Sequence, residues 1–224
     1  MKTKITILAL LISAVSFSQK QDAGDIPIEL EFAPLGASPL KIASLRARYF
    51  KSDDIAFRMS LYLGGSSKPT YSKPNDVELV SKTSDFNFVL RPGIEKHFEG
   101  TDNLSPYIGG ELSYGYKRNS SYTESNWSSN SSEIKAKNSV DSKSTFGMNV
   151  LTGADYYITD KIYLGVELGF GFQYEGRGGS SVVWENPENS SETDSDEIGN
   201  SSNFQWGPNY QATIRLGYCL KNKD

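Results

Sequence analysis

The stretch Ile162–Tyr174, IYLGVELGFGFQY, decides the fold of this chain because its side chains alternate strictly. Every second residue, beginning with Ile162, is a large apolar or aromatic one, and the residues between them are tyrosine, glycine, glutamate or glutamine. A period of two places the two sets on opposite faces of a β-strand. The stretch therefore predicts a strand with one apolar and one polar face.

The same alternation recurs along the chain and predicts an all-β fold of eight strands. Segment 40–50 slips phase near Ala43 and Ser44, which predicts a β-bulge that returns Leu45 and the alternate residues after it to the apolar face. The strands expected are 26–35, 40–50, 55–63, 86–98, 106–116, 146–158, 162–174 and 204–220.

The connections between these strands alternate between short and long. Short connections at one end and long ones at the other are typical of an eight-stranded antiparallel up-and-down barrel. The short ones are 51–54, 99–105 and 159–161, and the long ones are 65–85, 117–145 and 175–203.

Composition removes several classes of protein. The 224 residues are 37% hydrophobic with a mean hydropathy of -0.47, and no run of 18 uncharged apolar residues occurs, which excludes a helical membrane protein. A β-barrel remains possible because its signal per strand is weak. With Cys219 and His97 as its only cysteine and histidine, the chain lacks the residues for a disulfide scaffold or a Cys/His zinc site. We expect neither a metal nor a cofactor.

The first residues have the pattern of a secretory signal. Lys2 and Lys4 precede an apolar core, Ile5–Phe17, and small residues precede Gln19. We expect a signal peptide at residues 1–18 and a barrel domain at residues 19–224. Without the signal peptide, 21 basic and 27 acidic residues give a net charge of -6, which makes nucleic acid an unfavourable partner.

The polar face carries residues that suit a confined interior. Five of the seven arginines fall on it within strands, together with carboxylates and many glycines. Arginine forms bidentate pairs with carboxylates, and glycine leaves room for long side chains. A water-exposed surface of a soluble barrel is the alternative. The charge network expected in the lumen consists of Glu29, Glu31, Arg46, Arg48, Arg58, Arg91, Glu95, Glu111, Asp155, Glu167 and Arg215.

The apolar face would then meet outer-membrane lipid. Aromatic residues fall near both ends of the expected strands, as membrane interfaces favour. Those beside the short turns are Tyr49, Phe98, Tyr156 and Tyr218, and those beside the long loops are Tyr114, Tyr116, Phe146, Tyr174, Phe204 and Trp206.

Three phrases of the sequence carry a resemblance to a known family. The phrases 91–95 (RPGIE), 105–112 (SPYIGGEL) and 212–218 (ATIRLGY) are similar to strand signatures of small outer-membrane β-barrels of the OmpA/OmpX-like type. The resemblance covers residues 26–220. It implies that both termini face the periplasm and that the long loops face the outside of the cell.

No catalytic site is expected. Lipid-hydrolysing barrels use serine with histidine as base, but His97 lies at the short-turn end, so an outward-facing Ser/His site is not available. The loop 175–203 is acidic but lacks the spacing of a calcium loop, which favours a solvated surface. Its acidic residues are Glu185, Glu188, Glu192, Asp194, Asp196 and Glu197.

The sequence therefore predicts an outer-membrane barrel that is not an enzyme and has a structural or surface-interaction role. An extracellular partner would bind the loops 117–145 and 175–203, and a monomer is expected because barrel closure needs no partner chain. Two alternatives remain open: a narrow porin-like channel for small solutes, and a soluble periplasmic lipid carrier with its polar face outside.

Overall fold

The computed structural model describes residues 20–32, 42–73, 78–126, 136–185 and 193–221, so the expected signal peptide lies outside the described residues. These residues form ten strands and no helix. The strands are β1 (Ile26–Phe32), β2 (Ile42–Ser52), β3 (Ile55–Ser72), β4 (Glu78–His97), β5 (Leu104–Asn126), β6 (Ala136–Tyr157), β7 (Ile162–Arg177), β8 (Ser180–Glu185), β9 (Thr193–Ile198) and β10 (Ser201–Leu220). In this part of the chain no helix is long and apolar enough to cross a membrane.

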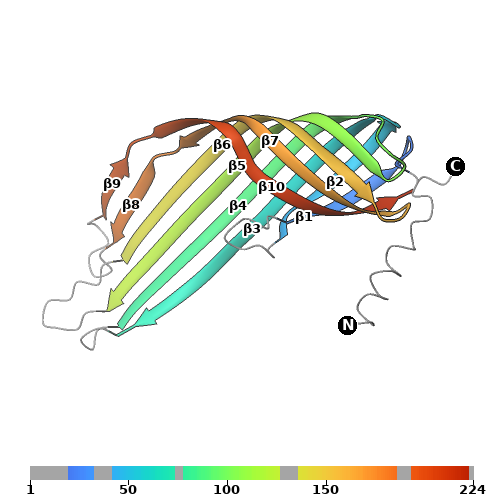
Figure 1. The fold of residues 1–224 in the computed structure, drawn as a ribbon. Coiled ribbons are helices and arrows are strands. Elements are labelled where there is room, and N and C mark those ends of the chain that lie inside the picture. The colour runs from blue at the N-terminus through green and yellow to red at the C-terminus, as the bar shows by residue number, and fades with distance from the viewer. Residues whose placement is uncertain (1–19, 33–41, 74–77, 127–135, 186–192, 222–224) are drawn as a thin grey trace, which may run out of the picture.

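Eight of the strands form a closed ring. Around it they run β1, β2, β3, β4, β5, β6, β7 and β10, and every neighbouring pair is antiparallel (Figure 1). The ring closes between the first and last strands, where Ile26 lies opposite Leu220. The predicted eight-stranded up-and-down barrel is confirmed.

The short connections lie together at one end of the ring, as predicted. In the turn from β6 to β7, Thr159 Oγ1 accepts hydrogen bonds from the backbone N–H groups of Lys161 (3.2 Å) and Ile162 (3.0 Å). In the turn from β2 to β3, the Ser52 hydroxyl donates to Asp54 Oδ1 at 2.6 Å. Side-chain caps of this kind fix tight turns locally, which explains why these turns could be read from the sequence.

The polar face of each strand points into the barrel. Along β7, Val166 and Leu168 are 58% and 61% exposed on the outside, whereas Tyr163 and Glu167 are 0% and 7% exposed. The 13 residues from Ile162 to Tyr174, at about 3.3 Å each and a tilt of about 40°, rise roughly 30 Å, close to the height of a bilayer's apolar band. This polarity disfavours the soluble carrier.

Aromatic side chains form a row across the outside of four adjacent strands. Tyr114, Phe146, Tyr174 and Phe204 lie directly opposite one another on β5, β6, β7 and β10, and all are exposed. The rings of Tyr114 and Phe146 are 4.9 Å apart. The row lies at the end of the apolar band away from the short turns, where a membrane interface favours aromatic residues.

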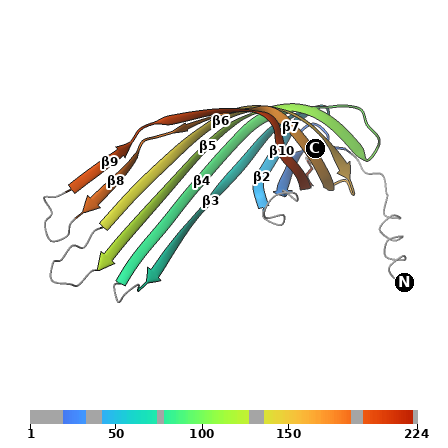
Figure 2. The same ribbon diagram turned by 60° about the vertical axis from the view of Figure 1, so that its left-hand side comes forward.

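The expected long loops are mostly β-structure, which corrects the sequence reading. Strands β3 to β6 continue past the ring, and the acidic stretch forms the hairpin β8–β9, in which Trp184 pairs with Asp194. We call these extensions the outer sheet: residues 62–72 of β3, 78–89 of β4, their partners in β5 and β6, and β8 and β9 (Figure 2). Serine, threonine and asparagine occupy both faces of these strands, so no alternation of apolar residues marked them.

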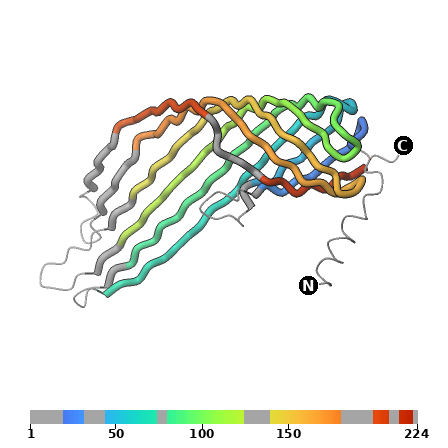
Figure 3. The backbone as a smooth tube through the Cα atoms, viewed as in Figure 1, coloured from blue at the N-terminus to red at the C-terminus, as the bar shows by residue number. Residues whose placement is uncertain are grey.

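The outer sheet extends to one side because the ring strands differ in length. β2 pairs with β3 only as far as Leu61, and in the described residues the rest of β3 pairs with β4 alone. β8 pairs with β6 beyond the end of β7, and β9 pairs with β8. Figure 3 shows β3 running outward past the ring. One wall of the barrel therefore continues outward, away from the short turns.

Two register shifts shape the ring. The pairing of β1 with β2 steps from Glu31↔Ser44 to Phe32↔Ile42 and passes over Ala43, which confirms the predicted bulge. A second shift lies between Asn209 and Thr213 of β10, a feature that the alternation did not reveal.

Candidate functional site: the charged barrel interior

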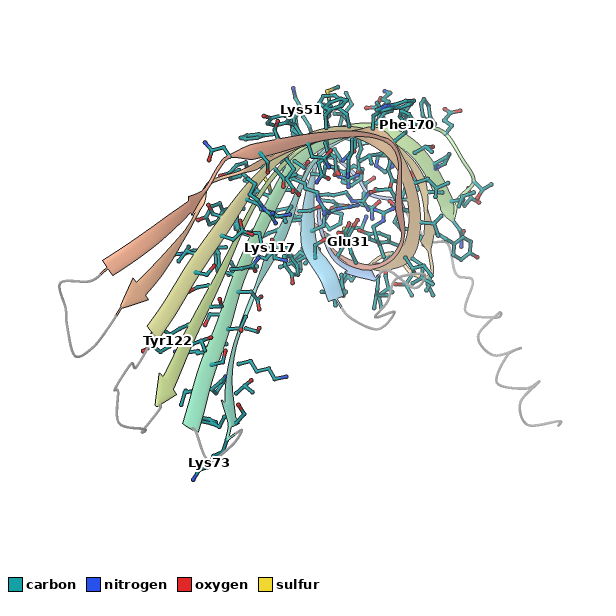
Figure 4. All side chains as sticks on the ribbon, turned by 90° about the vertical axis from the view of Figure 1, so that its left-hand side faces the viewer. Glu31, Lys51, Lys73, Lys117, Tyr122 and Phe170 are labelled. Atoms are coloured by element: carbon teal, nitrogen blue, oxygen red, sulfur yellow. The ribbon has the colours of Figure 1, made fainter. Side chains whose placement is uncertain are left out.

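The barrel interior is filled by paired charges. We call the interior network the four arginines and six carboxylates that lie inside the ring and are at most 7% exposed. Figure 4, which looks toward the open end of the barrel, shows side chains filling the ring, with Glu31 inside it. The members are Arg46, Arg48, Arg58, Arg215, Glu29, Glu31, Glu95, Glu111, Asp155 and Glu167.

The layer of the network nearer the short turns is built on Arg48 and Arg215. Arg48 lies 2.7 Å from Glu29, 3.0 Å from Glu95 and 2.8 Å from Asp155. Arg215 lies 3.1 Å from Glu29 and 2.8 Å from Asp155. The two guanidinium groups thus share two carboxylates. Asp155 of β6 joins β2 and β10, neither of which is a neighbour of β6 in the ring.

The next layer is built on Arg46 and Arg58, which share Glu167. Arg58 lies 2.8 Å from Glu167, 2.8 Å from Glu95 and 3.0 Å from Glu111. Arg46 lies 3.1 Å from Glu167 and also pairs with Glu31. Arg58 is on β3 and Glu167 is on β7, the strand four places away in a ring of eight, so this pair crosses the lumen.

Aromatic side chains hold the network in place. The Tyr107 hydroxyl donates to Glu167 at 2.6 Å, and the Tyr163 hydroxyl donates to Glu29. The guanidinium carbon of Arg48 lies 5.2 Å from the centre of the Tyr163 ring, within the range of a cation–π contact. Lumen-facing glycines provide the room: a Cβ at Gly217 would meet the Tyr163 ring.

Pairing is a physical requirement at this degree of burial. A carboxylate or guanidinium removed from water without a partner costs several kcal/mol. Each of the four arginines has at least two carboxylate partners, so no positive charge in the network is isolated. Six carboxylates against four arginines leave a formal excess of two negative charges.

Arg91, which the sequence placed in the network, lies outside it. It forms no ion pair with a described carboxylate and instead lines a cavity of about 350 Å³ at the outward end of the lumen. Arg91 lies four residues from Glu95 on the same strand face, nearer the outer sheet, and its charge acts on the buried Glu31 without an ion pair between the two side chains. We call this cavity the vestibule; Glu111 and Glu167 lie at its inner end and Lys117, Lys143 and Glu175 at its outer end.

His97 belongs to the interior at the short-turn end. Its Nδ1 lies 2.9 Å from the Ser105 hydroxyl and its Nε2 lies 3.2 Å from Glu95, and its ring packs between those of Phe50 and Tyr107. A hydroxyl, an imidazole and a carboxylate in this order resemble a nucleophile with its base. However, both Ser105 and His97 are 4% exposed, and neither lines the vestibule, so a substrate has no described access to them.

The first and last described residues of the chain contact each other at the short-turn end of the barrel. The backbone N–H of Gly24 donates to Phe50 O at 2.7 Å, and Lys221 Nζ lies 2.8 Å from Asp25 Oδ2 and 3.0 Å from Lys20 O. Burial works against the charge of Lys221, but its hydrogen bond to Asp25 and the charge of that carboxylate outweigh burial and raise the pKa of Lys221. We call these contacts the clasp; within it the Asp25 side chain is 2% exposed.

Four of the six acidic residues predicted in the loop 175–203 lie on strands β8 and β9. Glu185, Asp194, Asp196 and Glu197 are strand residues, whereas Glu188 and Glu192 lie outside the described residues. Within the described ranges, no group of histidine, cysteine and acidic side chains has the arrangement to hold a metal ion.

Comparison with known proteins identifies the family. A model of the family described as "Putative OmpA-OmpF-like porin family" matches residues 36–179, more than half of the chain. The chain belongs to this family. It is therefore an outer-membrane β-barrel protein, and the family is one of porin-like barrels rather than enzymes.

A solved structure is similar in fold to this chain. The crystal structure of the N-terminal β-barrel domain of Pseudomonas aeruginosa OprF is similar over 89% of this chain and 100% of that domain, with 16% sequence identity and a TM-score of 0.33. At this level no property of OprF is transferred to this chain. No curated protein matches the sequence.

Proposed function

We propose that this protein is an outer-membrane barrel whose lumen is closed by the interior network and whose role is carried by the outer sheet. The observation that supports closure is the pair Arg58–Glu167, at 2.8 Å, because its strands lie on opposite sides of the ring. Arg48 and Arg215, nearer the short turns, are 1% and 0% exposed. A continuous water path would wet these groups.

The position of the described chain ends supports an orientation with the short-turn end in the periplasm. Lys20 and Lys221 lie at the short-turn end, and an exported chain that carries a signal peptide at residues 1–18 would enter the membrane from the periplasm. The termini are then periplasmic and the outer sheet is extracellular. An extracellular partner would meet the parts of 117–145 and 175–203 that belong to the outer sheet. The ring closes with its own strands, which supports a monomer.

Conductance in planar bilayers tests closure. We expect no steady current from the purified wild type, and current from Arg58→Ala and Glu167→Ala, which remove one side of the crossing pair. Arg91→Ala is the matched control, since Arg91 lies outside the network, and it should stay silent. Heat-dependent gel migration of each variant verifies that the barrel is folded.

Two results would count against the proposal. Steady current in the wild type would make the protein a narrow channel for small solutes or ions, the second candidate. Silence in both folded variants would assign closure to the aromatic residues and the clasp at the short-turn end instead of the network.

Surface labelling tests orientation. A membrane-impermeant maleimide should label Tyr71→Cys on intact cells, because Tyr71 is 75% exposed in the outer sheet. It should not label Lys51→Cys at the short-turn end. The native Cys219 is 1% exposed and gives little background. The reverse labelling pattern would invert the proposed orientation.

A further inference from the structure

Three cations form a row across the wall of the barrel at the mouth of the vestibule. Lys117 lies directly opposite Lys143, and Lys143 lies directly opposite Arg177, on β5, β6 and β7. Like charges at directly opposite positions of a sheet destabilise it. Figure 4 shows Lys117 at the junction of the barrel and the outer sheet.

The carboxylates near this row do not balance it. Glu175 lies 2.8 Å from Lys143, and Asp141 lies 3.3 Å from Arg177. Lys117 forms no ion pair with a described carboxylate, and Arg91, deeper in the same cavity, interacts with the charge of Glu31 but forms no ion pair with a described carboxylate. The row and Arg91 together therefore have two more positive charges than Glu175 and Asp141 balance, and they lie outward of a network with an excess of two negative charges.

The inner end of the vestibule offers hydrogen-bond acceptors and donors. Glu111 and Glu167 line it, and Asn149 Nδ2 donates to Glu111 Oε1 at 3.2 Å. Ser113, Thr145 and Gln173 complete its polar wall. Carboxylate and amide groups held in fixed positions bind ligand hydroxyls, since each oxygen accepts hydrogen bonds from O–H donors.

We infer that the vestibule binds a small polyhydroxylated anion, of the class of a sugar phosphate or an acidic sugar. The anionic group lies between Lys117 at the mouth and Arg91 deeper in the cavity, and the hydroxyls face the carboxylates and amides at the inner end. A cavity of about 350 Å³ is within the range of small-ligand sites. This binding site would give the proposed surface role a ligand. It rests on the proposed function in one respect: the mouth of the vestibule must face the outside of the cell.

Two other ligand classes fit the cavity less well. A bare inorganic anion would bind the cations, but it would lie close to the carboxylates of Glu111 and Glu167 with no hydroxyl groups between the like charges. A neutral sugar would bind the polar groups at the inner end of the vestibule but would bring no anionic group to Lys117 and Arg91. The polyhydroxylated anion satisfies both ends of the vestibule.

Isothermal titration of the full-length protein in detergent tests the inference, with glucose 6-phosphate, glucose and inorganic phosphate as probes. We expect glucose 6-phosphate to bind at least about tenfold more tightly than either of the others, because a charge-assisted hydrogen bond is involved. Lys117→Gln and Arg91→Gln should each weaken it by about tenfold. Lys51→Gln removes the same charge at the short-turn end, where the side chain is exposed, and should change nothing.

Each possible result decides the matter. Equal affinity for glucose 6-phosphate and phosphate would overturn the role of the hydroxyls, and equal affinity for glucose would overturn that of the cations. Wild-type affinity in folded Lys117→Gln and Arg91→Gln, or no binding of glucose 6-phosphate at millimolar concentration, would overturn the site. Titration is independent of conductance, so failure here is distinguishable from failure of the closed lumen.

Discussion

Arg48 of β2 and Asp155 of β6 meet across the full width of the barrel, with Nη1 and Oδ2 2.8 Å apart. The two residues belong to strands four places apart in a ring of eight, and both are at most 1% exposed. The same guanidinium reaches Glu29 and Glu95. One side chain thus links four strands, and the interior near the short turns is organised around it.

Removing this guanidinium should destabilise the barrel strongly. Arg48→Met removes one cationic partner from each of three buried carboxylates, and we expect the free energy of unfolding to fall by about 3–5 kcal/mol. Urea titration of the protein in lipid vesicles measures the loss. Lys51→Met, which changes an exposed residue three positions away, is the control. An equal effect of the two substitutions would show that the network contributes no stability.

A glycine that faces the lumen should not tolerate substitution where an aromatic ring occupies the space that an added Cβ would need. A Cβ at Gly217 would meet the ring of Tyr163, which is fully buried and bonded to Glu29. We expect Gly217→Ala to cost about 1–3 kcal/mol, the usual range for overpacking. At Gly110 the nearest atom is the Asn149 carbonyl oxygen at 3.8 Å, so Gly110→Ala should be near neutral in the same urea titration. Equal costs at both positions would contradict this packing.

A charged substitution on the outward apolar face should destabilise the barrel only in the middle of the apolar band. Val166 is 58% exposed and lies two residues from Leu168, the midpoint of the apolar stretch Ile162–Tyr174. Val166→Arg would place a guanidinium in hydrocarbon and should cost about 2–4 kcal/mol. Tyr71→Arg, at the tip of the outer sheet, should leave unfolding in lipid vesicles unchanged. A tolerated arginine at Val166 would mean that lipid does not cover this face.

The clasp between the chain ends should weaken at alkaline pH. Because the pKa of Lys221 is raised in the folded protein, its pair with Asp25 contributes stability that is fully present below the ordinary lysine pKa of about 10.4. That contribution is lost as pH rises through the raised pKa. The difference in melting temperature between wild type and Lys221→Met should therefore be constant from pH 7 to 9 and shrink above it. A constant difference up to pH 12 would exclude the clasp as its source.

The sequence by itself determined the strands of the ring and their faces. Alternation and turn chemistry are local, so Ile162–Tyr174 specified both the apolar and the polar side of β7 without reference to the rest of the chain. It also placed the arginines on the inward face. The outer sheet was missed because its strands are polar on both faces, and no periodic signal separates such strands from a polar loop.

Only the tertiary structure decided which charges meet. Arg48 and Asp155 are 107 positions apart, and their contact depends on the tilt and stagger of eight strands, which set the height of every residue along the barrel axis. The same heights left Arg91 beside the vestibule without an ion pair to a described carboxylate. The pattern of a sequence gives the strand face on which each side chain lies, but not its height along the barrel axis. These heights determine which charges pair in the interior network and which remain at the positive mouth.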